Sequence, residues 1–212
     1  MSNIVLIAAP GAGKGVISNY LIDKYNYIHM SAGDLIREEI KNNEDLSNMV
    51  KEGKLIDDNI VNGLIRKYVE NNKDKNIIFD GYPRTMSQIP AFEEILSNND
   101  LSIDKVIHIN IDKEIAIKRI TGRVMCEKCN HIFNKYIDDL ADVCPVCGGK
   151  LYSRSDDNLD TYLNRYDLYI NETYPVFEYF NKNDNSYEIT NNKSIDEVYE
   201  QVDDIMKEDI LW

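Results

Sequence analysis

The chain has 212 residues, of which 43% are hydrophobic and 29% are charged, and its formal net charge at pH 7 is −13. This length suffices for one main domain with a buried core and one or two insertions. The acidic balance argues against general binding to nucleic acids or anionic membranes, because both require a dense basic surface. Any anionic substrate must therefore be met by cations gathered locally.

The N-terminal run MSNIVLIAAPG is apolar, but it lacks a basic flank and is broken by Pro10 and Gly11. These features are not those of a signal peptide, and no stretch approaches the ~20 apolar residues that cross a bilayer. We therefore expect a cytoplasmic protein without a membrane or nucleic-acid partner. In that compartment, four cysteines are more often metal ligands than disulfides.

Short apolar, β-branched runs alternate with helical patterns along the chain. Strands are predicted at 3–9, 76–81 and 105–111, with a weaker one at 185–190. Helices are predicted in the segments between and after these runs, at 13–25, 33–42, 57–72, 87–98, 112–120, 158–180 and 194–207. Strands that alternate with helices predict an α/β fold, with a doubly wound parallel sheet and helices on both faces.

The first predicted strand and helix are joined by a glycine-rich loop, and residues 8–16 read AAPGAGKGV. A P-loop reads G-x-x-x-x-G-K-[S/T] in this context, but here Ala8 replaces the first glycine and Gly15 replaces the hydroxyl residue. The loop still offers three features that bind nucleotide phosphates: backbone N–H groups that point inward, the N-terminus of the following helix, and the lysine. The residues predicted to bind ATP here are Pro10, Gly11, Ala12, Gly13, Lys14, Gly15 and Val16.

Residues 122 to about 155 interrupt the alternation, since they are rich in Cys, Gly and polar turns and lack an amphipathic period. They predict a small insertion with its own means of stability. Two C-x-x-C pairs with 14 residues between them lie in it: Cys126, Cys129, Cys144 and Cys147. This arrangement favours a structural Cys₄ zinc site over a redox dithiol or buried free thiols. His131 is surplus to that ligand set, and Phe133 could cover either the nucleotide or the zinc knuckle.

Arginine is the basic residue that needs explaining, because the chain has 17 lysines and only seven arginines. The planar guanidinium fork suits bidentate phosphate recognition, whereas lysine acts as a point charge. The seven arginines stand at 37, 66, 84, 119, 123, 154 and 165.

With these motifs in view, the sequence resembles the adenylate kinases, nucleoside monophosphate kinases whose loop typically reads G-x-P-G-A-G-K-G-T. Glycine after the lysine is normal in that family, so the departures are Ala8 and Val16. The resemblance covers essentially the whole chain and is carried by HMSAGDLIR (29–37), GKLIDDNIV (53–61), DGYPRTMSQ (80–88), KRITGR (118–123) and LYSRSDDNLDTYLNR (151–165). Six of the seven arginines fall on family motif positions, and only Arg66 does not.

The resemblance implies roles for the matching residues. Catalysis would use Lys14, Asp80, which serves the hydration shell of a Mg²⁺ bound with ATP, and the arginines Arg84, Arg119, Arg123, Arg154 and Arg165. ATP would also contact Arg119, Arg123 and Phe133. AMP would be bound by Ser31, Ala32, Arg37, Ile56, Asp57, Asp58, Gly81, Arg84, Gln88, Arg154 and Arg165.

The resemblance also implies an organisation and a reaction. The P-loop core would comprise 1–30, 58–121 and 160–212, with a mobile monophosphate-binding helical segment at 31–57 and a zinc-bearing lid at 122–159. The expected reaction is reversible, Mg²⁺-dependent phosphoryl transfer from ATP to AMP, giving two ADP for adenine nucleotide homeostasis. Members of this family are often monomers, which is the state expected here.

Three alternatives remain open. Ala32 stands where adenylate kinases usually carry threonine and is more like the UMP/CMP kinases, whereas Gln88 and the zinc-bearing lid favour AMP. The departures at Ala8, Val16, Ala32 and Val124 suggest a catalytically silent nucleotide-binding relative, although every charged group that the chemistry needs is present. A zinc-ribbon nucleic-acid module is disfavoured by the net charge.

Overall fold

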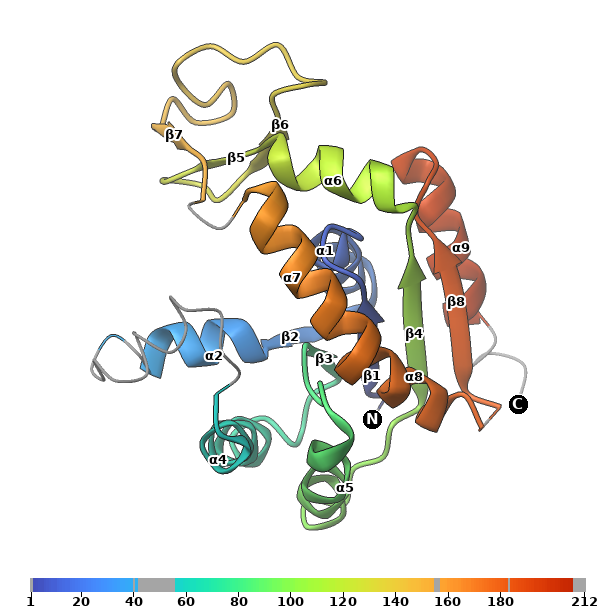
Figure 1. Ribbon diagram of the computed structural model, residues 1–212. Helices are drawn as coiled ribbons and strands as arrows, with labels where there is room; N and C mark the ends of the chain where they lie inside the picture. Colours follow the sequence, from blue (N-terminus) through green and yellow to red (C-terminus); the bar gives the residue numbers. More distant parts are fainter. Residues whose placement is uncertain (1, 40, 42–55, 155–156, 183, 208–212) are drawn as a thin grey trace.

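The computed structural model describes residues 2–39, 41, 56–154, 157–182 and 184–207 of the chain. A five-stranded sheet forms the centre, in the order β2-β3-β1-β4-β8, and every pairing in it is parallel (Figure 1). Its strands are β1 (Ile4–Ala8), β2 (Ile28–Ser31), β3 (Ile77–Asp80), β4 (Lys105–Asn110) and β8 (Ser186–Thr190). This arrangement confirms the predicted parallel α/β fold.

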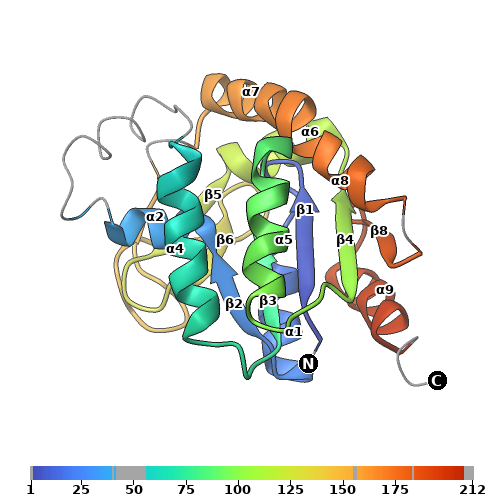
Figure 2. The same cartoon turned by 90° about the horizontal axis from the view of Figure 1, so that it is seen from below.

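Helices cover both faces of this sheet, as the sequence predicts, because alternate strand residues point to opposite sides. In β1, Val5 and Ile7 belong to a core cluster shared with α4 (Asp58–Glu70), α5 (Ile89–Ser97) and α8 (Tyr174–Phe180). Their neighbours Ile4 and Leu6 belong to a second cluster, shared with α1 (Lys14–Tyr25) and α9 (Ile195–Lys207). Figure 2 shows these two helical layers on either side of the sheet.

The remaining helices are α2 (Ala32–Glu39), the 3₁₀ turn η2 (Met86–Gln88), α6 (Lys113–Thr121), α7 (Leu159–Leu168) and the π-helical turn η3 (Tyr169–Thr173). The single helix predicted over 158–180 is wrong in one respect, since η3 separates α7 from α8. Pro175 lies in the first turn of α8 and has no N–H to continue the helical ladder. An inserted π turn accommodates that break.

Strand β2 was not predicted, because only Met30 of its four residues is buried and two others are the polar His29 and Ser31. Such a short edge strand lacks the apolar run that marks the other strands. The structure describes the predicted monophosphate-binding segment (31–57) only in part, because residues 40 and 42–55 lie outside the described residues. The end of the predicted helix 33–42 and the first three residues of GKLIDDNIV (53–55) fall among them.

The predicted insertion folds as a separate three-stranded antiparallel sheet in the order β6-β5-β7. Its strands are β5 (Arg123–Cys126), β6 (Ile132–Asn134) and β7 (Leu151–Tyr152). It has its own small core around Cys126, Phe133 and Cys144. Figure 1 shows this sheet and α2 extending from the same side of the molecule. Among the described residues, none of the helices has the length and apolar character needed to span a bilayer.

Candidate active site

The glycine-rich loop lies where β1 ends and α1 begins, as the P-loop prediction requires. Gly11 and Gly13 have φ of 82° and 86°, values that favour glycine. Neighbouring atoms also leave little room for a side chain, because a Cβ on Gly11 would lie 3.0 Å from the carbonyl oxygen of Ala116. At the loop's two unusual positions, Ala8 is a buried strand residue and Val16 is 37% exposed. Ala8 is therefore part of the sheet core, whereas the Val16 side chain reaches solvent.

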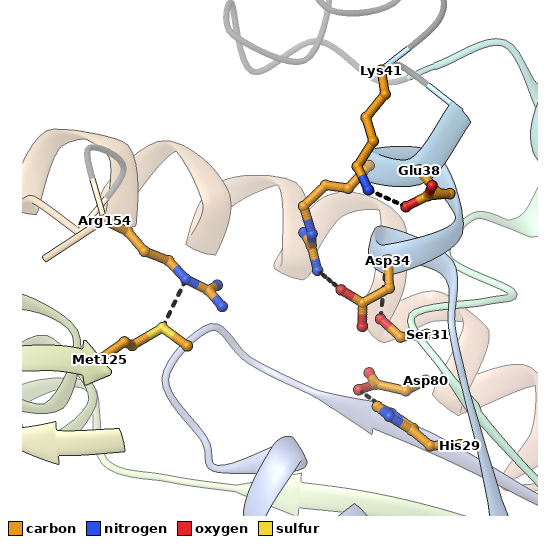
Figure 3. Close-up of polar contacts among 9 residues, drawn as sticks. His29, Ser31, Asp34, Glu38, Lys41, Asp80, Met125 and Arg154 are labelled. Atoms are coloured by element: carbon orange, nitrogen blue, oxygen red, sulfur yellow. Dashed lines mark hydrogen bonds and ion pairs between the residues drawn. The ribbon is translucent and has the colours of Figure 1, made fainter. Parts of the chain in front are cut away.

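Lys14 and Asp80 meet at the carboxyl ends of β1 and β3, the edge at which parallel α/β sheets bind ligands. Lys14 Nζ lies 3.4 Å from Asp80 Oδ1. On the other carboxylate oxygen, His29 Nε2 lies 3.0 Å from Asp80 Oδ2 (Figure 3). Burial alone would raise the pKa of Asp80, but the charge of Lys14 and the hydrogen bond with His29 outweigh burial and lower this pKa. The Asp80 carboxylate is therefore ionised at neutral pH.

A cavity of about 100 Å³ opens beside this pair. Three cations line it, since Lys14 is joined by Arg84, which follows β3, and Arg165 from α7. The pKa of the Arg84 guanidinium is lowered, first by burial and then by the like charge of Arg165. Like charges held together at a partly buried site favour an anion between them. The cavity is therefore suited to phosphate oxygens.

Arg119 approaches the P-loop from α6. Its Nη2 donates to Asn191 Oδ1 at 3.2 Å, and burial lowers the pKa of its guanidinium. Arg119 also lies over the loop, because its Nη1 would be 3.9 Å from a Cβ on Gly13. Arg119 is therefore the fourth predicted cation, after Lys14, Arg84 and Arg165, that lies at or near the phosphate loop.

The other predicted arginines have different partners and do not line the cavity. Arg123 makes a two-pronged ion pair with Asp157, in which Nε and Oδ2 are 2.8 Å apart. Arg154 Nε lies 3.0 Å from the sulfur of Met125 (Figure 3). Arg37 pairs with Asp34 on the exposed part of α2. Their predicted contacts with nucleotide stay predictions.

Gln88 has the most defined environment of the residues predicted to bind AMP. Its Oε1 accepts the backbone N–H of Arg84 at 2.7 Å, and its Nε2 donates to Asp58 Oδ1 at 2.7 Å. Asp58 opens α4, directly after its N-cap Asp57, whose carboxylate accepts the N–H of Asn59 at 2.8 Å. A carboxylate only accepts and an N–H only donates, so the orientation of the Gln88 amide is fixed by its neighbours.

Other residues predicted to bind AMP surround this region. Ser31 ends β2 and its hydroxyl accepts the N–H of Asp34 at 3.2 Å. Ala32 is buried at the start of α2, and Ile56 is buried in the core cluster of α4 and α5. Gly81 lines the cavity with φ of 77°. Contact of these residues with a ligand stays a prediction.

The four cysteines of the insertion come together. Their sulfur atoms all lie within 4.8 Å of one another. The Cys126–Cys147 and Cys129–Cys144 sulfur distances are 3.4 and 3.7 Å. Tetrahedral zinc with Zn–S bonds of about 2.3 Å places sulfurs about 3.8 Å apart. A Cβ on Gly149 would lie only 2.8 Å from Cys126 Sγ, so the chain leaves room for these sulfurs. The cluster therefore fits a zinc ion.

Phe133 is buried beside two of these cysteines, which favours the knuckle-covering alternative over the nucleotide-covering one. His131 packs against the Phe133 ring, with centroids 4.6 Å apart. Val124 packs against the same small core. Arg66, the arginine outside the family motifs, lies near the exposed Glu94, 3.8 Å away.

Three polar residues of the site were not singled out from the sequence for their roles: His29 on Asp80, Asp157 on Arg123, and Asn191 on Arg119. Of these three, only the position of Asn191 could have been inferred from the sequence. It follows a predicted strand, so it lies at the same sheet edge as the P-loop. Nothing in the spacing of His29 points to Asp80.

Comparisons with known proteins agree with this geometry. The family model described as adenylate kinase matches residues 6–185 of the chain. The chain is 39% identical over 211 residues to an adenylate kinase of Pelagibacter ubique, covering 97% of this chain and 99% of that protein. It is 36% identical to an adenylate kinase of Geobacillus sp., with 96% and 98% covered, and 34% identical to one of Thermosipho africanus, with 97% and 99% covered.

Proposed function

The chain belongs to the adenylate kinase family of phosphotransferases, and we propose that it transfers a phosphoryl group from magnesium-bound ATP to AMP, giving two ADP. The observation that supports this most directly is the cavity lined by Lys14, Arg84 and Arg165 beside the P-loop. In-line phosphoryl transfer needs positioned reactants and cations at the transferring oxygens, and it needs no covalent intermediate. The proposed cellular role is adenine nucleotide homeostasis.

Each part of this cluster has a task in the proposed reaction. The P-loop N–H groups and Lys14 bind the β- and γ-phosphates of ATP. Arg119 approaches the same loop from α6, whereas Arg84 and Arg165 neutralise charge where donor and acceptor meet. These cations supply the local positive charge that an otherwise acidic protein needs to bind anionic substrates.

Asp80 fits the proposed magnesium site. Its carboxylate is ionised and lies next to the P-loop lysine. Mg²⁺ is usually held by one or two carboxylates together with waters and substrate phosphates. When bound, the ion neutralises charge on the phosphates. Gly15 offers no hydroxyl for the ion, so Asp80 would be its main protein partner.

Gln88 supports adenine as the acceptor base. Its amide, held by Asp58 and the Arg84 N–H, keeps one N–H and one oxygen lone pair for a ligand. Adenine presents an amino donor beside a ring-nitrogen acceptor, the pattern that an amide complements. AMP is therefore the proposed acceptor, in preference to UMP or CMP.

The proposed organisation keeps the P-loop core (1–30, 58–121 and 160–212), the monophosphate-binding segment (31–57) and the lid (122–159). Structural zinc at the four cysteines would hold the lid rigid, so that it closes as a body and excludes water from the donor phosphate. A cytoplasmic monomer is the proposed state of the protein.

Steady-state turnover of ATP and Mg²⁺ with AMP, CMP or UMP tests the function, with products separated by chromatography. The proposal predicts ADP from AMP, at a kcat/KM well above that for either pyrimidine nucleotide. A preference for CMP or UMP would place the chain with the UMP/CMP kinases. ATP binding without turnover of any acceptor would favour the catalytically silent alternative.

A further inference from the structure

Asn191 lies at a junction of three segments that the proposed reaction needs. It directly follows β8 and is only 4% exposed. Its backbone N–H donates to the carbonyl of Asn110, at the end of β4, at 2.8 Å. Its side-chain Nδ2 donates to the carbonyl of Ala12 in the P-loop at 2.8 Å, and its Oδ1 accepts from Arg119 Nη2 at 3.2 Å.

The orientation of this amide is determined by its partners. The Ala12 carbonyl can only accept and the Arg119 guanidinium can only donate. A reversed Asn191 amide would therefore lose both hydrogen bonds. A buried amide held at both ends in this way costs free energy to disturb, because either partner would be left unsatisfied.

The P-loop leaves room for this contact at Gly13. A Cβ there would lie 2.5 Å from Asn191 Nδ2, closer than real Cβ atoms approach. The amide thus occupies the space that a side chain at position 13 would need. Gly13 also has φ of 86°. Loop conformation and amide position are therefore mutually dependent.

The chemistry of the partner matters for Arg119. An amide orients the guanidinium without neutralising it, in contrast to Arg123, whose partner is the carboxylate of Asp157. A guanidinium with a neutral partner keeps its full charge for a phosphate. Arg119 lies next to the P-loop, where a positive charge would attract a bound nucleotide.

We propose that Asn191 is a positioning residue for the donor nucleotide, because it holds the P-loop at Ala12 and the guanidinium of Arg119 beside that loop. The identification of this nucleotide as ATP rests on the proposed function. Asn191 acts through the loop and the arginine, and it need not touch the nucleotide itself.

Three variants of the full-length protein test this proposal, with ATP affinity measured by calorimetry and KM for each substrate measured in turnover. Asn191→Ala removes both hydrogen bonds. Asn191→Asp keeps the shape but neutralises Arg119 and sets an oxygen against the Ala12 carbonyl. Asn192→Ala is the matched control, since the Asn192 side chain accepts only the N–H of Asp112, at 2.8 Å, among its described contacts.

The expected order of ATP affinity is wild type, then Asn191→Ala, then Asn191→Asp. We expect about a tenfold loss for alanine, equivalent to about 1.4 kcal/mol, and a larger loss for aspartate. KM for AMP should change by less than about twofold, and Asn192→Ala should resemble wild type. A purely space-filling role would give the reverse order, with aspartate close to wild type and alanine weakest.

The proposal is overturned if aspartate binds ATP as well as asparagine, or if KM for ATP and for AMP rise together. It is equally overturned if Asn192→Ala has the same effect. Urea unfolding of each variant confirms that binding is measured on folded protein. If the wild type binds ATP but does not phosphorylate AMP, the proposed function fails while the calorimetric order still tests Asn191.

Discussion

At the scale of single residues, we expect the Asp58–Gln88 hydrogen bond to determine which base the proposed acceptor site selects. The carboxylate of Asp58 and the backbone N–H of Arg84 hold the Gln88 amide from both ends. Ser87 adds a third contact, since its hydroxyl donates to Asp58 Oδ2 at 2.6 Å. An amide held in this way matches adenine, whereas hypoxanthine presents an acceptor where adenine presents a donor.

Asp58→Asn should weaken this selectivity, because asparagine can offer either an oxygen or an NH₂ group to Gln88. We expect the preference for AMP over IMP, expressed as a ratio of kcat/KM, to fall by about tenfold, within the range of one paired hydrogen-bond contact. Glu70→Gln is the control, because Glu70 is exposed at the far end of the same helix and the variant loses the same charge. An unchanged AMP-to-IMP ratio in Asp58→Asn would refute this role.

Residue types were more predictable than residue pairings. The glycine-rich loop and the C-x-x-C pairs, which are local in sequence, singled out Lys14 and the four cysteines, whereas Asp80 and Arg84 were singled out by the resemblance to the adenylate kinases. The partners of these residues come from distant segments, as with His29 on Asp80. Such pairings depend on sheet order, which no local pattern contains.

At the scale of elements, β4 and the π turn η3 are joined through a buried histidine. His108 is 2% exposed, its Nε2 lies 2.6 Å from the Tyr169 hydroxyl, and its ring stacks on Phe177. Burial lowers the pKa of His108 below its ordinary value of 6.5, and the nearby Glu188 carboxylate opposes this only in part. Tyr174 also packs edge-on against the ring. His108 is therefore neutral in the folded protein at neutral pH.

This lowered pKa makes folding stability depend on pH. Below its ordinary pKa of 6.5, His108 binds a proton in the unfolded chain but not in the folded one, so stability falls as pH decreases. Between about pH 7.5 and about pH 5.5, the wild type should lose up to about 1.4 kcal/mol that a His108→Gln variant does not lose. Urea unfolding of both proteins at each pH measures the difference, and parallel pH dependences would contradict the assignment.

We expect the insertion to depend on the proposed zinc ion for stability, because its own core is small. Gly149→Ala should lower zinc affinity by about tenfold or more, as other changes next to metal ligands do, since the new Cβ would lie 2.8 Å from Cys126 Sγ. Competition with a chromophoric chelator measures the affinity. Gly63→Ala is the control, because a Cβ there meets no atom within 4 Å.

Undiminished zinc affinity in Gly149→Ala would contradict the proposed sulfur geometry. Removal of zinc from the wild type should also lower the melting temperature, whereas it should have no effect on a Cys144→Ser variant that lacks the site. Equal effects on both proteins would indicate that the chelator acts elsewhere.

Long amphipathic helices and buried strands were predictable from the sequence, whereas the short strands were not. The run from Ile4 to Ala8 is buried at every position, and its apolar pattern is continuous. Strands β2, β6 and β7 have two to four residues, of which at most one in each strand is buried, so no apolar run marks them. Tyr169 of the π turn contacts His108 of β4 across 61 residues of sequence, and no local pattern contains such a contact.

At the scale of the whole molecule, a chain with a net charge of −13 brings several cations together at one cavity. Lys14, Arg84, Arg119 and Arg165 come from four segments that the parallel sheet brings to the carboxyl ends of its strands. The surface acidity limits nonspecific anion binding, and the local cluster supplies the field that holds polyphosphates. The fold therefore concentrates positive charge where phosphoryl transfer would take place.

Transfer of a labelled γ-phosphate tests this account most directly. The purified protein is incubated with Mg²⁺, AMP and ATP labelled at the γ-phosphate, and the labelled products are separated. We predict that the label enters ADP formed from AMP, in step with AMP consumption and without release of labelled inorganic phosphate. Label that stays in ATP, or that appears as inorganic phosphate, would contradict a site that holds donor and acceptor together.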